Sequence, residues 1–345
     1  MKHLLSYSVY QDMGFFGRGP EALLKAMGCD GLEMLTSYDE VPDQHSRLTA
    51  AVHLPYATDW MAAWEGRPYE MDDASSRIYM YGRSPEDVVS NIMLAVRRAE
   101  KASPPYGVMH LTNADIPFMH TRRFPRGDSE VISCFSEVMN RVASEFPGGE
   151  PPFQILFENL WWPGLRMTDL SGYRLLERKI EFSRWGLCLD VGHLMNCLPG
   201  IRTEQDGIEA VLDVVSRYDA DAVDRIRTVH FHYSASSEYR DSFEERTPGD
   251  GPITDFLIGL YPHVGSIDRH MPFSDPRCAE ILDILRPEYV THEMPGSEIG
   301  PLEDFIKQRS LLPRHLRQVS RMDAGQDGIV EPFLYDLYNA TARGM

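Results

Sequence analysis

The sequence predicts a parallel (β/α)8 barrel of the TIM type, because eight short β-type runs recur along 345 residues and most are followed by helical patterns. An open doubly wound sheet usually has fewer strands. The number of runs and their alternation with helices therefore favour a closed barrel. The β-type runs lie at 3–9, 31–36, 48–56, 106–112, 153–160, 185–192, 226–234 and 288–294.

Helical patterns fill most of the intervals between these runs. The clearest start is Ser84-Pro85-Glu86-Asp87, where a capping residue, a first-turn proline and two acidic residues precede an apolar periodic stretch. The link after 31–36 is short and has room for little more than one helical turn. The predicted helices span 20–28, 84–102, 129–146, 168–180, 203–218 and 275–286.

We expect one domain, residues 1–312, that carries two long insertions at 57–83 and 235–274. Loops of this length in a compact domain are usually functional or disordered. The first insertion holds Trp60 and Trp64, whose rings are suited to stacking on a substrate. Packing of the same aromatic rings against the barrel is the competing interpretation. Residues 313–345 are interpreted as a C-terminal extension with one helix.

Composition and charge narrow the classes of partner. The formal net charge of −18 disfavours binding to nucleic acid or to anionic membranes, which requires clustered Lys and Arg. No apolar run reaches the ~18 residues of a membrane span. Five scattered cysteines without CxxC spacing suit a reducing compartment. We therefore expect a cytoplasmic protein that acts on a small molecule, with its oligomeric state left open.

Ionisable side chains accumulate where the predicted strands end. In a (β/α)8 barrel these carboxyl ends face the active site. A single histidine there is more often a hydrogen-bonded core residue, but imidazoles and carboxylates together are costly to bury unless they are paired or bind metal. Such a mixture is the ligand set of Zn²⁺, Mn²⁺ or Fe²⁺. The residues are His53, His110, Glu158, Asp190, His193, His230, His232 and Glu293, with Asp268 and His270 in the loop after the seventh strand.

These residues resemble the xylose-isomerase-like TIM barrels, and within them a metal site of the endonuclease IV type. The matching segments, in the family's order, are FENL (157–160), CLDVGH (188–193), VHFHYS (229–234), DRH (268–270) and HEM (292–294). The resemblance implies three metal sites per chain. Their ligands would be His53, His110 and Glu158 for the first, Glu158, Asp190, His230 and Glu293 for the second, and His193, Asp268 and His270 for the third.

The first functional hypothesis is a metal-dependent hydrolase that cleaves a phosphate ester or a related bond of a small anionic substrate. Two or three divalent ions are expected, zinc first and manganese or iron as alternatives, with Glu158 bridging two of them. Arg122 and Arg123, after the fourth strand, are suited to holding an anionic group, although solvated loop arginines would look the same. His232 is expected to contact the substrate.

The second hypothesis is a single-metal sugar or keto-acid isomerase or epimerase, in which Glu158 and Glu293 move a proton through an enediolate. Asp268 and His270 would then contact the substrate, which would be sugar-like. An abasic-site DNA endonuclease, which the resemblance also implies, is disfavoured by the acidic charge and the aromatic insertion. A non-catalytic barrel with a structural or lost metal is the remaining alternative, and it leaves a costly ligand set unexplained.

Overall fold

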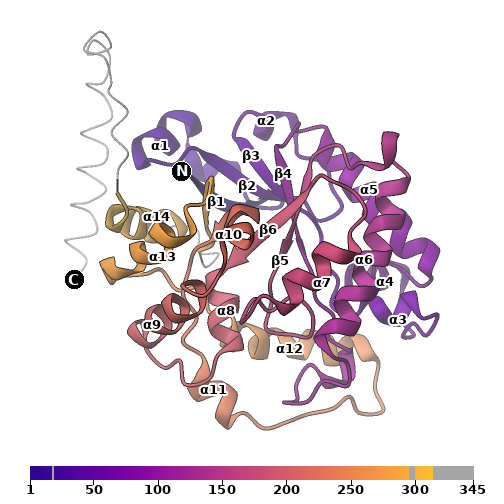
Figure 1. The fold of residues 1–345 in the computed structure, drawn as a ribbon. Helices are drawn as coiled ribbons and strands as arrows, with labels where there is room; N and C mark the ends of the chain where they lie inside the picture. The colour runs from indigo at the N-terminus through magenta and orange to yellow at the C-terminus, as the bar shows by residue number, and fades with distance from the viewer. Residues whose placement is uncertain (18, 295–299, 314–345) are drawn as a thin grey trace, which may run out of the picture.

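In the computed structural model, which describes residues 1–17, 19–294 and 300–313, eight parallel strands close into a barrel (Figure 1). The strands pair in chain order, and β1 pairs with β8 to close the ring. The predicted (β/α)8 barrel is confirmed. The strands are β1 (Lys2–Ser8), β2 (Gly31–Leu35), β3 (Thr49–His53), β4 (Tyr106–His110), β5 (Gln154–Glu158), β6 (Trp185–Asp190), β7 (Ile226–His230) and β8 (Tyr289–His292).

Helices follow each of the eight strands and surround the barrel. The six predicted helices correspond to α1 (Pro20–Met27), α5 (Pro85–Glu100), α6 (Asp128–Ser144), α7 (Ser171–Lys179), α9 (Glu204–Val215) and α13 (Ala279–Leu285). The short link after β2 holds the four-residue helix α2 (Asp43–Ser46), as expected. Further helices that the sequence pattern did not predict are α8 (Val191–Cys197), α10 (Ala220–Arg225) and α14 (Gly300–Leu311).

The two long insertions fold into short helices and contact one another. Residues 57–83 hold α3 (Trp60–Trp64) and α4 (Asp73–Met80). Residues 235–274 hold α11 (Ser237–Ser242) and α12 (Ile253–Ile267), and these two helices lie in the lower part of Figure 1. The hydroxyl oxygens of Tyr79 and Tyr261 lie 3.2 Å apart, so side chains of the two insertions meet. Of the predicted C-terminal extension, residues 314–345 lie outside the described residues.

Helix α5 illustrates how local sequence fixes an outer helix. The Ser84 side chain accepts a hydrogen bond from the backbone N–H of Asp87, and Pro85 occupies the first turn, where its missing N–H costs nothing. The apolar residues recur with a helical period, so one face is buried against the barrel. Inside the barrel a second apolar layer fills the lumen; it includes Leu4, Val108, Leu156 and Cys188. Cys188 belongs to this apolar layer, and it also lies close to Glu158 and His230.

The strand register gathers the polar residues at one end of the barrel. Strands β3 to β7 end on His53, His110, Glu158, Asp190 and His230, and β8 ends one residue before Glu293. Neighbouring strands pair His110 with Glu158 and Asp190 with His230. Because the strands are parallel, their carboxyl ends share one rim of the barrel. The fold therefore brings residues from five separate strands to one place.

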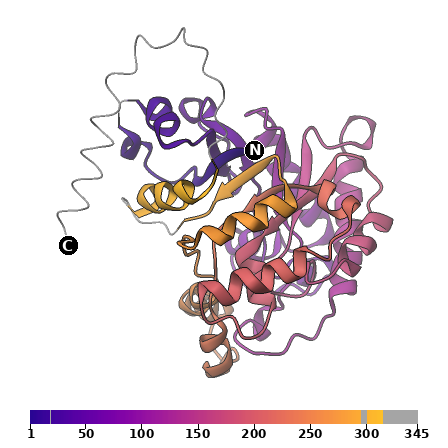
Figure 2. The ribbon, with the colours of Figure 1, turned by 60° about the vertical axis from the view of Figure 1, so that its left-hand side comes forward.

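Helix α14, the last described helix, lies outside the barrel beside the end of α1. Helix α14 lies next to α1 in both ribbon views (Figures 1 and 2), and Nε of Arg309 donates a hydrogen bond to the carbonyl oxygen of Gly28 at 3.3 Å. Within residues 1–17, 19–294 and 300–313, no helix has both the length and the apolar character needed to span a membrane.

Candidate metal centre

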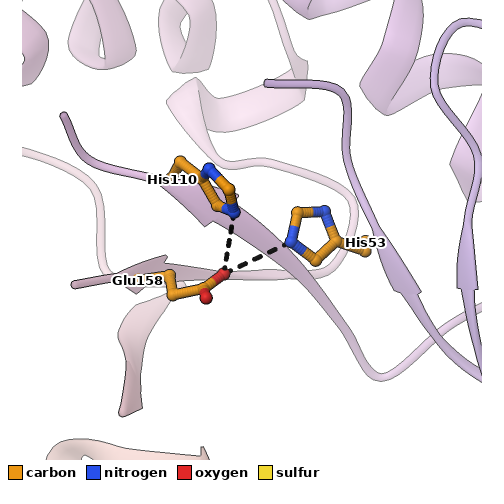
Figure 3. A group of neighbouring side chains, drawn as sticks. All are labelled: His53, His110 and Glu158. Carbon is orange, nitrogen blue, oxygen red and sulfur yellow. Dashed lines mark hydrogen bonds and ion pairs between the residues drawn. The ribbon is translucent and has the colours of Figure 1, made fainter. Parts of the chain in front are cut away.

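His53, His110 and Glu158 form the first candidate group (Figure 3). Both imidazole Nε2 atoms point at the same carboxylate oxygen, Glu158 Oε2, at 3.3 Å from His53 and 3.4 Å from His110. Burial lowers the pKa of His110 to about 3, so this ring is neutral at physiological pH and keeps a lone pair for a ligand. The geometry matches the first predicted ligand set.

Glu158 also reaches the neighbouring residues through its second oxygen. Oε1 lies 3.2 Å from Nδ1 of His193 and 3.3 Å from Nδ1 of His230. The carboxylate is fully buried, which opposes its charge, but the imidazoles of His230 and His110 outweigh burial and hold its pKa well below the usual range. Glu158 is therefore an ionised carboxylate with one oxygen toward each of two groups of nitrogen donors. This is the arrangement expected of a bridging ligand.

Asp190 ends β6 and also caps the next helix. Its Oδ1 accepts a hydrogen bond from the backbone N–H of His193 at 2.5 Å, which starts α8. The cap places His193 one turn beyond the strand, on the side of the barrel mouth. Burial opposes ionisation of Asp190, but His193 and His232 lower its pKa below the ordinary value. The sequence Asp-x-x-His thus sets two donors at a fixed separation by an ordinary capping interaction.

Asp268 and His270 reach this cluster from the second insertion. Asp268 Oδ2 lies 3.3 Å from His193 Nε2 and 2.8 Å from His270 Nε2. Burial opposes the charge of Asp268, but His270 and His193 hold its pKa well below normal. The same pairing, against burial, raises the pKa of His270 to about 9. The third predicted ligand set is therefore assembled in the structure as well.

Glu293 and His232 complete the cluster. Glu293 Oε1 lies 3.3 Å from Nδ1 of His230, and its Oε2 lies 3.5 Å from Nδ1 of His270. His232 is fully buried, its Nε2 lies 3.0 Å from Asp190 Oδ2, and its ring stacks on that of His270 with centroids 4.1 Å apart. All nine predicted ligands, together with His232, are thus linked by contacts in one continuous cluster.

Two of the imidazoles each lie between a backbone carbonyl and a carboxylate. Nδ1 of His53 faces the carbonyl oxygen of Leu54 at 2.8 Å while Nε2 faces Glu158. Nδ1 of His193 faces the carbonyl oxygen of Asn159 at 2.9 Å while Nε2 faces Asp268. A neutral imidazole has only one N–H, so it cannot donate to both of these acceptors. Each ring therefore needs a second proton or a cation at Nε2, the nitrogen that faces the carboxylate. A divalent metal in place of that proton fits this arrangement.

Buried polar atoms without hydrogen bonds support the same fit. Among the described residues, Glu158 Oε1, His230 Nδ1 and Asp268 Oδ1 are buried and have no hydrogen-bond partner. Such atoms are rare in folded proteins because leaving them unpaired is costly. Imidazole and carboxylate donors suit Zn²⁺, Mn²⁺ or Fe²⁺. The residues present therefore fit a metal centre, with candidate groups that include His53-His110-Glu158 and His193-Asp268-His270.

The structure corrects the expected exposure of Trp60 and gives Arg122 and His232 partners within the protein. Trp60 is 1% exposed; its ring packs edge-on against Phe135 and its indole N–H donates to the carbonyl oxygen of Thr112 at 2.7 Å. It is a core residue, as the competing interpretation held. Arg122 donates to the backbone carbonyls of Arg240 and Phe243, so it ties two loops together. His232 lies inside the donor cluster and not on an accessible surface.

The remaining two predicted contacts, Trp64 and Arg123, have neighbours outside the donor cluster. Trp64 is half-buried, and the guanidinium of Arg141 lies over its ring, 5.1 Å from the centroid. Arg123 is exposed, and its backbone N–H donates to the hydroxyl of Thr121. A role of either side chain in substrate binding stays a prediction.

Two residues at the site escaped the sequence analysis. Glu33, in the middle of β2, is fully buried, and its Oε1 lies 2.8 Å from Nε2 of His230. Tyr56, three residues after β3, is 49% exposed and stacks on His110 with centroids 4.5 Å apart. The signal for Glu33 was a carboxylate inside an otherwise apolar strand run. Tyr56 carried no signal beyond its position, because an aromatic residue after a strand is ordinary.

The fold and the donor cluster define a (β/α)8 barrel with candidate metal-binding groups at the carboxyl ends of its strands. Two solved structures illustrate proteins that share this barrel fold. Endonuclease IV from Thermus thermophilus aligns with 90% of this chain and 98% of its own, at 14% identity and a TM-score of 0.50. A putative xylose isomerase from Rhodospirillum rubrum aligns over the same shares, at 12% identity and a TM-score of 0.52. No family model and no curated protein matches the chain.

Proposed function

We propose that this protein is a metal-dependent hydrolase that cleaves a phosphate ester or a related bond of a small anionic substrate at a di- or trinuclear centre. The observation that carries the proposal is the third donor group. His193, Asp268 and His270 stand beside the groups that share Glu158, although two of the three come from a separate insertion. A centre that needs only one metal has no use for this additional group as ligands.

The charges of the cluster support bound cations and an anionic substrate. Five carboxylates lie in or against the cluster, namely Glu33, Glu158, Asp190, Asp268 and Glu293; the first three are fully buried, and the side chains of the other two are 13% exposed. Without cations this set would repel an anion. Zinc is the first expectation from the imidazole donors, with manganese or iron as alternatives.

When bound, such ions polarise a phosphoryl oxygen and activate water near neutral pH. The chain's own residues hold and orient the site. Glu158 spans two donor groups with its two oxygens, and the backbone carbonyls of Leu54 and Asn159 fix the ring orientations of His53 and His193. Tyr56 presents an exposed ring over His110, which is suited to a flat or cyclic part of the substrate.

One observation favours a second candidate function, a single-metal sugar or keto-acid isomerase or epimerase. Glu158 Oε1 and Glu293 Oε1 each lie 3.3 Å from Nδ1 of His230, so two carboxylates flank one imidazole from different strands. Two carboxylates on either side of a substrate carbon are what proton transfer through an enediolate requires. In that case Asp268 and His270 contact the substrate. An abasic-site DNA endonuclease is less well supported, because of the net charge of −18.

Metal content and metal-dependent turnover test the proposal. We expect two or three equivalents of zinc, manganese or iron in the purified protein, and metal-dependent hydrolysis of phosphate mono- or diesters. Glu158→Gln should lower that activity by more than about 100-fold, since even indirect partners of a metal site contribute 10–100-fold. Glu209→Gln, an exposed carboxylate paired with Arg277 on the surface, is the matched control.

Other outcomes assign the alternatives. One equivalent of metal, together with exchange of a sugar carbon-bound proton for solvent deuterium, would replace the hydrolase by the isomerase. Retention and cleavage of an abasic duplex at low salt would restore the DNA endonuclease. Unchanged activity in Glu158→Gln would remove the bridging role of that carboxylate.

A further inference from the structure

The second insertion is joined to the loop after β4 by four aromatic side chains that include none of the predicted ligands. His120, in that loop, and His263, in α12, are 8% and 4% exposed, and their ring centroids lie 4.0 Å apart. Phe243 packs edge-on against His263 with centroids 4.6 Å apart, and Tyr239, in α11, lies beside the same ring. We call His120, Tyr239, Phe243 and His263 the insertion joint.

The contacts of His263 are those of a neutral imidazole. Nε2 faces the carbonyl oxygen of Met119 at 3.2 Å, and because a carbonyl can only accept, Nε2 carries the N–H. Nδ1 lies 2.8 Å from the hydroxyl oxygen of Tyr239, which donates to the remaining lone pair. One nitrogen is therefore satisfied by the loop after β4 and the other by α11. A second proton, on Nδ1, would displace the hydroxyl hydrogen of Tyr239.

The charged groups around the insertion joint oppose a positive charge on either imidazole. The backbone N–H of Arg246 donates to the carbonyl oxygen of His120 at 3.0 Å, so this cationic residue is held beside the pair. Arg122 lies over the ring of Phe243, 4.2 Å from its centroid. The carboxylate of Glu245 is paired with Arg122. A protonated imidazole would thus meet a second imidazole at 4.0 Å and two arginines nearby.

The pKa values of the pair follow from this environment. Burial, then the neighbouring His120 and Arg246, lower the pKa of His263 to about 4, and burial with Arg246 lowers the pKa of His120 as well. Because the folded-state pKa lies below the ordinary 6.5, the neutral rings stabilise the insertion joint above pH 6.5. This stabilisation is lost as the pH falls from 6.5 through about 4.

The insertion joint lies on the helix that leads into two candidate ligands. Helix α12 ends at Ile267, and Asp268 follows as its C-cap, with His270 beyond. His263 ties this helix to the loop after β4 through Met119. Separation of the insertion joint would therefore detach α12 from the loop and free the segment that carries Asp268 and His270.

We propose that the insertion joint is an acid-sensitive contact, which holds the second insertion on the loop after β4 at neutral pH and opens when His120 or His263 takes up a proton. While the joint is closed, Asp268 and His270 stay beside His193. When it opens, the third donor group is no longer assembled. This consequence for metal binding rests on the proposed function, whereas the acid-sensitive contact does not.

Hydrogen exchange of the metal-free, full-length protein tests the proposal. Mass spectrometry follows peptides from α12 at pH 7.5 and pH 5, with rates corrected for the intrinsic effect of pH and with α5 as the internal reference. His263→Gln is the test variant, since its amide can donate to the carbonyl of Met119 and accept from Tyr239 but does not titrate. The donor cluster titrates in both proteins, so the comparison removes its effect.

From pH 7.5 to pH 5, the exchange rate of α12 should rise about 30-fold more in the wild type than in His263→Gln. This factor corresponds to a pKa of about 4 in the closed joint and about 6.5 in the open one. His120→Phe keeps a ring but removes one charge, so its rise should be smaller than that of the wild type. His45→Gln is the matched control, because this buried histidine of α2 lies outside the insertion joint, and burial lowers its pKa too. Its exchange should respond as in the wild type.

Three results would overturn the proposal. An equal rise in the wild type and in His263→Gln would assign the acid sensitivity to other groups. An equal rise in α5 would mean that the whole barrel unfolds, and unchanged exchange of α12 in the wild type would mean that the joint stays closed. If His263→Gln does not fold, the wild type is compared with His120→Phe, and equal rises in these two also reject the inference. A purified protein without metal would contradict the proposed function, while hydrogen exchange still decides the acid-sensitive contact.

Discussion

Nε2 of His193 lies 3.3 Å from Oδ2 of Asp268, although the two residues are 75 positions apart in the chain. The contact joins the first turn of α8 to the end of α12, and so joins the rim of the barrel to the second insertion. An insertion that is anchored in this way contributes candidate donors, Asp268 and His270, to the cluster. The position of Asp268 is therefore the most direct point at which to test how many metals the protein holds.

Asp268→Asn should reduce the metal content by one equivalent. The neutral amide loses the charge that faces both His193 and His270, while the groups that share Glu158 keep all their donors. Elemental analysis after dialysis against a metal-free buffer measures the change. Asp255→Asn, an exposed acid on the same insertion, should leave the content unchanged. An equal number of metal ions per chain in Asp268→Asn and Asp255→Asn would exclude Asp268 as a ligand.

The metal-free protein should lose stability as the pH rises from about 6.5 to about 9. The pKa of His270 is raised to about 9 from an ordinary 6.5, so protonation favours the folded state. This contribution to the free energy of unfolding is fully present below pH 6.5 and is lost as the pH rises through about 9, the pKa of His270 in the folded protein. It amounts to at most about 3 kcal/mol.

Denaturant unfolding at pH 6, 7.5 and 9, after chelation and in His270→Asn, measures this pH effect. The free energy of unfolding of His270→Asn should fall less than that of the wild type over the same pH range. The zinc-loaded wild type should show the opposite slope, because metal binding requires unprotonated imidazoles and is stronger at higher pH. If the free energy of unfolding fell equally with pH in the wild type and in His270→Asn, the pH dependence would belong to other groups.

Gly192→Ala should disturb the cluster through His232. A Cβ at position 192 would lie 2.1 Å from Cε1 and 2.4 Å from Nδ1 of His232, so the ring must move and lose its contact with Asp190. We expect a loss of about 1–3 kcal/mol in the free energy of unfolding, together with weaker metal binding.

Gly259→Ala is the matched control for this substitution. It also lies within a helix, but nothing surrounds its Cβ position, so the change should stabilise the protein by up to about 1 kcal/mol. Urea unfolding and a zinc titration of both variants make the comparison. Equal stability of the two variants would mean that the His232 ring can shift at no cost.

Arg122→Ala should loosen the second insertion, since its guanidinium donates to the carbonyl oxygens of Arg240 and Phe243 and lies over the ring of Phe243. Losing these contacts should cost about 1–2 kcal/mol locally and raise the rate of limited proteolysis between 240 and 250 about 5–30-fold. Arg123→Ala should leave that rate unchanged. A selective rise in KM for an anionic substrate, without faster proteolysis, would restore Arg122 as a substrate contact.

The barrel and the donor cluster were predictable because both follow from periodicity. Eight apolar runs define eight strands, and parallel strands place their carboxyl ends together, so polar residues at those ends must meet. His53, Glu158 and Asp190 could therefore be placed from the sequence alone. Whether they bind metal stays a prediction.

The residues whose partners were not expected depend on information that spacing does not carry. Trp60 and Arg122 were chosen by residue type in a loop, but whether a loop side chain points into the core, at another loop or at a substrate is decided by tertiary contacts. Glu33 was overlooked because an acid within a strand run has no partner in the sequence nearby. Its partner His230 comes from β7, far along the chain and across the barrel lumen.

Asn159 binds the backbone of Asp190 twice, accepting from its N–H at 2.8 Å and donating to its carbonyl at 3.0 Å, while its own carbonyl oxygen faces Nδ1 of His193. It also directly follows Glu158. A single peptide segment at the tip of β5 is therefore fastened to the tip of β6 and to the first turn of α8. Any displacement of this segment moves Glu158, Asp190 and His193 together, so the backbone helps to set the spacing of these three candidate donors.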